Sequence, residues 1–245
     1  MIGMIAEYQK IDSNIGAAVK VALAARGVPT GIDSANLLAG DLYPEMLAAR
    51  LELSARERAL LSRANPELLI PENIPYSETS LRKVVYKSTG LTPGSPLENI
   101  EVFDVETREM STIKVAPYAM TDSDDVFEVV AKRISAGLGR HARGASRDLV
   151  IATARTNKVR WARQLAGAEN CGWCAMLTSR GAVYSEKTVR FQAHDNCDCT
   201  ATLVTNSGVW QGKEESEKLA RMWAKSGNLA DFTKAFRGAQ DEISA

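Results

Sequence analysis

Every cysteine of this 245-residue chain lies in one stretch, as CGWC at positions 171–174 and DNCDC at positions 195–199. His194, one of only two histidines, precedes Cys197 by three residues. The stretch therefore has the form C-x2-C, nineteen intervening residues, and then H-x2-C-x-C. Five side chains that can bind a soft metal, all within 29 residues, predict a compact module built around them.

Zinc is the metal that this spacing favours, because a C-x2-C turn is a common way to bring two thiolates onto one ion. The candidate ligands are Cys171, Cys174, His194, Cys197 and Cys199. Disulfides across the segment and small buried thiols stay open as alternatives. A redox-active CGWC is disfavoured because no βαβ pattern precedes it, and a papain-like pair because four clustered cysteines favour a structural role.

The overall composition is balanced, with 45% apolar residues and 30 basic against 30 acidic side chains. The whole molecule therefore has no bulk electrostatic attraction to DNA or to an anionic membrane. The N-terminal residues do not have the pattern of a signal peptide, and no apolar run approaches the roughly 20 residues of a membrane span. We expect no membrane association, and synthesis in a reducing cytoplasm with the cysteines as thiols or thiolates.

Local charge is less even, because residues 131–170 carry nine basic and two acidic side chains. In a continuous helix, one stripe would hold Arg140, Arg143, Arg147, Arg155 and Lys158. Gly144 could break that line. The alternative is an ordinary solvated face, with the opposite side packed through Val150, Ala154 and Trp161.

Helical periodicity dominates the chain and predicts a predominantly helical α+β fold. A first helix is expected to end at Gly27, and a short one capped by Asp33 or Ser34 to follow through Leu38. A longer helix is expected to begin at Pro44 and to restart at a capping box of Ser54 and Glu57. The proline-rich stretch 66–75 should be a connector, followed by a helix over 80–87. Alternating β-branched residues predict a hairpin of roughly 100–116.

In the second half, GLGRHARGAS at 137–146 is expected to separate two long helices, the second running from about 146 to 165. His141 in this break should be a solvated loop residue. A short strand is predicted after Cys199, and helices over about 213–224 and 229–240 end the chain. The predicted domains are an N-terminal helical region with the hairpin (1–120), a cysteine and histidine module (121–208) and a C-terminal helical tail (209–245).

CGWCAMLTSRGAVY followed by FQAHDNCDCTATLV resembles the C-terminal motif of the Mu F-like phage head morphogenesis proteins, in the form found in minor capsid proteins of phages that infect actinobacteria. The resemblance covers roughly residues 146–205. The matching positions are Cys171, Trp173, Cys174, Arg180, Gly181, Tyr184, His194, Asp195, Cys197 and Cys199. Trp173 and Tyr184 are expected to form the core of this module.

The resemblance implies a structural protein inside the phage head near the portal, with a role in assembly or genome delivery. It implies the portal protein as a partner, with packaged DNA and other head proteins as further candidates. The basic stripe would then face DNA or an acidic portal surface. The alternative is a zinc-containing module that binds nucleic acid. No enzyme is expected, because the sequence has no triad, phosphate loop or H-E-x-x-H motif.

Overall fold

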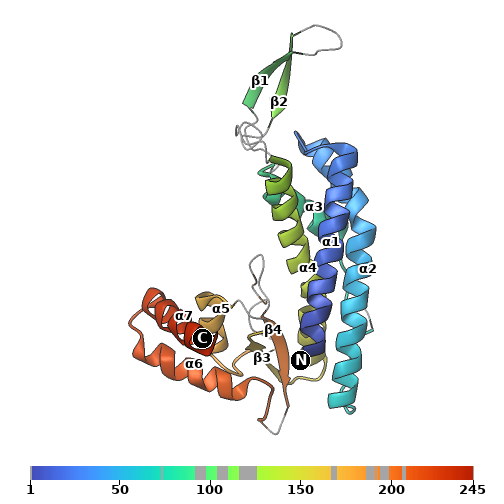
Figure 1. Cartoon of the computed structure of the whole chain (residues 1–245). Helices are drawn as coiled ribbons and strands as arrows, with labels where there is room; N and C mark the ends of the chain where they lie inside the picture. The colour runs from blue at the N-terminus through green and yellow to red at the C-terminus, as the bar shows by residue number, and fades with distance from the viewer. Residues whose placement is uncertain are drawn as a thin grey trace. The chain divides into compact units, whose positions relative to one another are not determined.

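The computed structural model describes residues 2–72, 74–91, 98–103, 110–115, 126–166, 170–185, 191, 193, 199–205 and 208–244. Its elements are α1 (Ile2–Arg26), α2 (Ile32–Ala64), α3 (Glu78–Thr89), β1 (Glu98–Phe103), β2 (Met110–Val115), α4 (Val126–Thr156), β3 (Arg160–Gln164), α5 (Gly172–Thr178), β4 (Thr200–Val204), α6 (Lys213–Lys225) and α7 (Leu229–Ser244) (Figure 1). Helices dominate, which confirms the predicted α+β, mainly helical class.

The chain forms two compact units. The helical unit comprises Ala6–Ala49 and Pro75–Ala142, and the cysteine unit comprises Met1–Ile5, Arg50–Ile74 and Arg143–Ala245. Helices α1, α2 and α4 each contribute residues to both units. The domain boundaries near residues 120 and 208 stay a prediction, because units of dense contact need not be units that fold alone.

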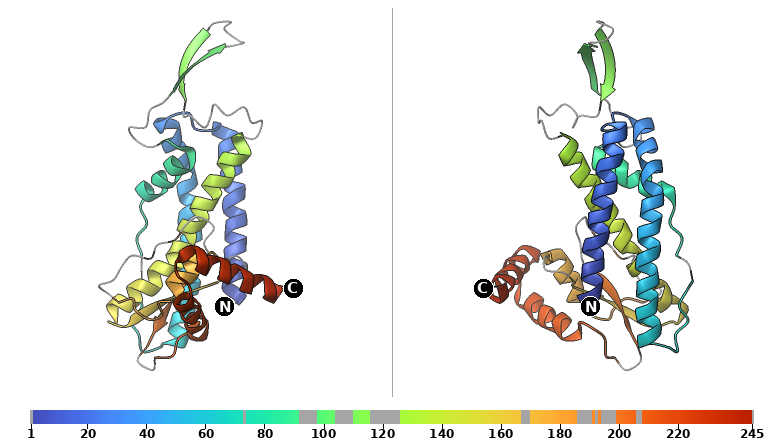
Figure 2. Two further views of the ribbon diagram at one scale, coloured as in Figure 1. Left: turned by 90° about the vertical axis from the view of Figure 1, so that its left-hand side faces the viewer. Right: turned by 45° about the vertical axis from the view of Figure 1, so that its right-hand side comes forward.

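In the helical unit, α1 buries one apolar stripe at spacings of three and four residues. The stripe consists of Tyr8, Ile11, Ile15, Val19 and Leu23. The stripe faces the interior of the helical unit, whose long helices α1 and α2 are seen from two sides in Figure 2. Gly27 ends α1 in a left-handed conformation with φ of 76°, and its N–H donates to the Leu23 carbonyl at 2.8 Å. The predicted glycine cap is therefore confirmed.

Helix α2 runs without interruption through Pro44, so the predicted start at Pro44 and the restart at Ser54 are wrong. An interior proline costs a helix about 3 kcal/mol. The buried side chains of Leu42 and Met46 flank the proline on one apolar stripe. Their burial offsets that cost, which local propensity alone does not reveal.

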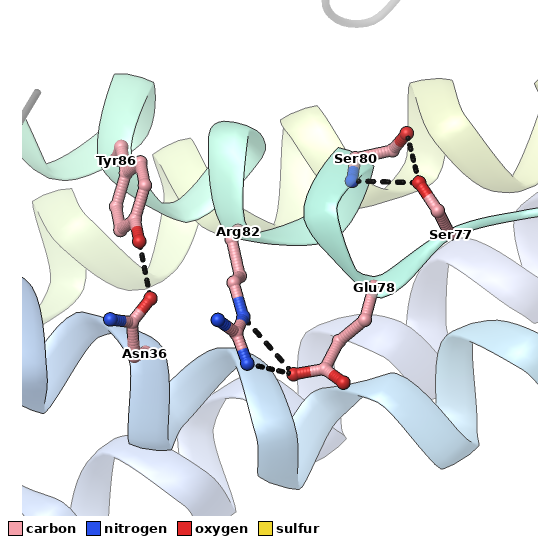
Figure 3. A network of polar contacts seen from close by, with 6 residues as sticks. All are labelled: Asn36, Ser77, Glu78, Ser80, Arg82 and Tyr86. Carbon is pink, nitrogen blue, oxygen red and sulfur yellow. Dashed lines mark hydrogen bonds and ion pairs between the residues drawn. The ribbon is translucent and has the colours of Figure 1, made fainter. Parts of the chain in front are cut away.

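Helix α3 confirms the predicted helix and is held by polar contacts at its start. Ser77 caps it by accepting from the Ser80 N–H at 3.3 Å. One turn on, Arg82 pairs with Glu78 at 2.7 Å, and the Tyr86 hydroxyl donates to Asn36 of α2 (Figure 3). The first two contacts stabilise the start of α3 itself, and the bond from Tyr86 to Asn36 joins α3 to the first part of α2.

Helix α4 is continuous across 137–146, so the predicted break there is wrong. The close approach of α3 explains why position 137 of this helix is a glycine. A Cβ at Gly137 would meet Cγ1 of Val84 at 2.6 Å, so the missing side chain lets α3 approach α4. His141 therefore lies in a helix rather than a loop, and its Nδ1 is 3.0 Å from the Tyr76 hydroxyl.

Two antiparallel pairs of strands are described. β1 pairs with β2, which confirms the predicted hairpin, and β3 pairs with β4, with Trp161 opposite Leu203. The strand after Cys199 is thus confirmed as β4. The helix predicted to reach residue 165 is wrong, because α4 ends at Thr156 and 160–164 pair with a distant segment.

At the end of the cysteine unit, α5, α6 and α7 pack together around Leu219, Phe232 and Phe236 (Figure 1). α6 and α7 confirm both predicted C-terminal helices. At Gly172 of α5, a Cβ would lie 2.2 Å from Oγ1 of Thr233, so α7 crosses α5 at a glycine. Within the described residues, no helix combines the length and apolar character needed to cross a membrane.

Candidate functional site

The two cysteine clusters meet at the sulfurs of Cys174 and Cys199. Cys171 caps α5, and its sulfur accepts the Cys174 N–H at 3.3 Å. This turn directs Cys174 into the interior, where it is 2% exposed, while Cys199, 1% exposed, stands at the start of β4. Their sulfurs are 3.6 Å apart. Residues 25 apart in the chain therefore share one buried point.

The sulfur separation excludes a disulfide between Cys174 and Cys199 and fits both a hydrogen-bonded pair of thiols and a shared metal ion. A disulfide would require about 2.05 Å. Two thiolates at about 2.3 Å from a tetrahedral zinc are about 3.8 Å apart, close to the observed 3.6 Å. No cluster of three metal-ligating side chains is present among the described residues. The predicted ligands His194 and Cys197 lie outside the described residues, so zinc stays a prediction.

Two buried arginines converge on Cys199 from different elements. Arg163 of β3 donates from Nη1 to the Cys199 sulfur at 2.9 Å, and Arg147 of α4 donates from Nε to its carbonyl at 2.8 Å. The two side chains are only 4% and 3% exposed. A guanidinium beside sulfur stabilises the thiolate over the thiol. The centre can therefore hold a negatively charged sulfur, as metal binding requires.

An aromatic wall completes this centre. The guanidinium carbon of Arg163 lies 3.8 Å from the Phe191 ring centroid, and that of Arg147 lies 5.1 Å from it. Phe191 also packs on Trp161, which stacks on Tyr184 with centroids 4.4 Å apart. Cation–π contacts of this kind gain strength where water is excluded. The arginines are thus held by both polar and aromatic partners.

Tyr184 and Trp173, the expected core pair, lie in two adjoining clusters. Tyr184 is buried with Trp161 against α4, and its hydroxyl donates to the Leu177 carbonyl at 3.2 Å. Trp173 is half-buried and packs on the cluster of α5, α6 and α7. Phe191 packs against both clusters. The module core is therefore wider than the predicted pair.

The basic stripe is not a continuous exposed surface. Arg143 and Arg147 are each 3% exposed, and Arg140 is half-buried. Val150 and Ala154 are buried as well. Helix α4 is therefore buried on more than one face, and some of its basic side chains lie in the interior. The expectation that all five basic residues face a partner is wrong for Arg143 and Arg147. For Arg140, Arg155 and Lys158, contact with DNA or the portal stays a prediction.

Arg163 and Phe191 are the site residues that the sequence interpretation missed. Residues 160–164 were assigned to a helix, which hides that Arg163 lies beside the strand that begins next to Cys199. The available signal was the strand predicted at 200–205, because a single strand needs a partner of similar length. RWARQ at 160–164 is that partner.

Comparison with known proteins relates this site to phage proteins. Residues 101–226, which include all four cysteines, match the family described as VG15 protein. The Gene 15 protein of Mycobacterium phage D29 is 29% identical to this chain over 29% of the chain and 37% of its own length. The chain thus spans 37% of the curated relative that it matches. No solved structure matches this chain. These matches support a phage protein and do not confirm the Mu F-like resemblance.

Proposed function

This chain belongs to the VG15 protein family, and we propose that it is a structural protein of the phage particle, a minor capsid protein that acts in head morphogenesis. Its place would be inside the head near the portal, with assembly in the host cytoplasm. The family match over residues 101–226 and the phage source of the relative support this proposal. The Mu F-like sequence motif supplies the finer assignment to the portal.

The observation that carries a structural role is the closed centre around Cys199. Its sulfur, the Cys174 sulfur and the guanidinium groups of Arg147 and Arg163 are all removed from solvent. A substrate would have to displace packed side chains to reach them. Buried polar centres of this kind stabilise and specify a fold. We therefore expect the centre to keep the cysteine unit intact within an assembly rather than to catalyse a reaction.

Virion composition tests the proposal. Quantitative mass spectrometry of purified virions of the phage that carries this gene should detect the protein at far fewer copies than the major capsid protein. Co-expression with the portal protein of the same genome should yield a complex in size-exclusion chromatography. A protein abundant in infected cells but missing from virions would contradict the assignment.

A zinc-containing module that binds nucleic acid is the second candidate, favoured by the 3.6 Å separation of the Cys174 and Cys199 sulfurs. Elemental analysis of untagged protein should find about one zinc per chain, lost in Cys174→Ser and in Cys199→Ser. A free-thiol count under denaturing conditions provides the control. All four thiols titrating with no metal would identify plain thiols, and fewer titrating would identify a disulfide.

Exposed basic residues allow the nucleic-acid part to be tested separately. Each neutralised phosphate contributes roughly 0.9 to the salt slope of duplex binding. Arg155→Gln with Lys158→Gln should flatten that slope if the module binds DNA, because both side chains are exposed. Loss of the portal complex with unchanged DNA affinity would assign these residues to the portal instead.

A further inference from the structure

A groove of about 570 Å³ opens on the surface of the cysteine unit. Its walls come from the start of β3, the turn after α5, the end of β4 and one face of α6. All of these elements belong to one unit. The volume lies within the range of sites that take a small molecule or a short segment of chain.

The charge of the groove is positive. Lys158, Arg160 and Lys213 line it with one carboxylate, Glu217, so three cations and one anion leave a net charge of +2. All four side chains are exposed. The Lys213 ammonium donates to the Gly208 carbonyl at 3.2 Å, which holds it at the wall. A ligand with acidic groups would complement this surface.

The hydrogen-bonding groups of the groove distinguish among acidic ligands. The hydroxyl of Ser179 donates to the Met176 carbonyl at 2.7 Å, and that of Ser216 to the Thr178 carbonyl at 2.7 Å. Both hydroxyl protons are therefore used, and only Ser179, which is half-buried, leaves an oxygen that can accept from a ligand. With the Glu217 carboxylate, the groove offers acceptors beside its cations. A phosphodiester backbone has only acceptors to present, whereas a peptide brings both N–H donors and carboxylates.

Apolar lining adds a second requirement. Val159, Val204 and Trp210 contribute to the groove, so an apolar side chain can enter between the charged groups. The phosphates of a duplex lie on a convex surface and carry no such side chain. We propose that the groove binds a short acidic peptide segment, with an apolar residue flanked by Asp or Glu, from a partner protein. This inference does not require that the partner be a head protein.

The test uses the full chain and a fluorescein-labelled peptide in which one leucine is flanked on both sides by aspartates. Fluorescence anisotropy should show saturable binding of this peptide and none of its asparagine counterpart. The double variant Arg160→Glu with Lys213→Glu should weaken binding by about tenfold or more, through repulsion of the carboxylates. Both positions are exposed, and circular dichroism spectra should match those of the unaltered protein.

Lys218→Glu is the matched control, because Lys218 is an exposed cation on α6 that does not line the groove. It should leave peptide affinity within about twofold. Equal binding of the aspartate and asparagine peptides would overturn the proposal, and so would equal loss in Lys218→Glu. A short DNA duplex that binds in place of the peptide, and is lost in the double variant, would overturn it in favour of nucleic acid.

Discussion

The helical unit and the cysteine unit are stabilised by different kinds of contact. Apolar stripes dominate the packing of the first, as on α1, where Ile11, Val19 and Leu23 recur at helical spacing. The second has apolar clusters too, but its centre joins a sulfur, two arginines and an aromatic ring. Apolar stripes tolerate many substitutions of similar volume, whereas a buried polar centre depends on each partner. Four experiments can break or sharpen this contrast.

The largest effect is expected from an apolar residue of the cysteine unit. Phe232 is fully buried, 5.3 Å from the Trp223 ring centroid and 6.2 Å from that of Phe236. Phe232→Ala should lower the free energy of unfolding by about 3–5 kcal/mol in urea denaturation. Val209→Ala, at an exposed position, should change it by less than about 0.5 kcal/mol. A cost below about 1 kcal/mol for Phe232→Ala would show that this cluster is loosely packed.

Arg163→Lys tests whether geometry or charge holds the polar centre. Lysine keeps the positive charge but loses the planar group that stacks on Phe191 and reaches the Cys199 sulfur. We expect a loss of about 2 kcal/mol in the free energy of unfolding. Arg160→Lys, an exposed position of the same strand, should be nearly neutral. If Arg163→Lys lowered the free energy of unfolding no more than Arg160→Lys does, positive charge rather than geometry would hold the centre.

Gly137→Ala tests packing in the helical unit. Alanine is the better helix former by about 1 kcal/mol. The new Cβ would lie 2.6 Å from Val84, however, and we expect a net loss of about 1–2 kcal/mol by thermal or urea denaturation. Gly40→Ala in α2 has open space and should stabilise by about 0.5–1 kcal/mol. Stabilisation by both changes would mean that α3 and α4 adjust freely.

Glu57 gives the smallest expected effect, through pH. Burial raises the pKa of this carboxyl from 4.5 to about 7. The folded state then holds a proton that the unfolded state releases, so stability is lost as pH rises from about 4.5 to about 7. Glu57→Gln should remove about 1 kcal/mol of that decline, measured by urea denaturation at pH 5 and pH 8. An unchanged decline in Glu57→Gln would contradict this assignment.

The sequence predicts local features of this fold better than distant pairings. The glycine cap at Gly27 and the hairpin formed by β1 and β2 depend on neighbouring residues, and both were predicted. Pro44 was misread as the start of a helix and Gly137 as part of a break between helices, because tertiary packing outweighs their local propensities. β3 was misread as helix, because its strand partner lies about 40 residues further along the chain.

At the candidate site, too, local spacing was predictable from the sequence and distant contacts were not. Spacing indicated that Cys171, Cys174 and Cys199 belong to one module, and the Cys174 and Cys199 sulfurs meet. Charge counting placed Arg147 on an exposed stripe, but it is buried beside Cys199. Nothing in a single sequence states which of several arginines turns inward. That choice depends on the aromatic ring and the carbonyl that receive it.

The contacts of Cys199 also determine when the cysteine unit can fold during synthesis of the chain. Its partners Arg147, Arg163 and Cys174 precede it by 52, 36 and 25 residues. All three leave the ribosome before the residue that joins them. Long-range contacts of this kind form late, and chains that wait for them expose unfinished surfaces. A nascent chain can therefore complete much of its helical unit early, but the cysteine unit must stay open until Cys199 has emerged, so chaperones have their longest access there.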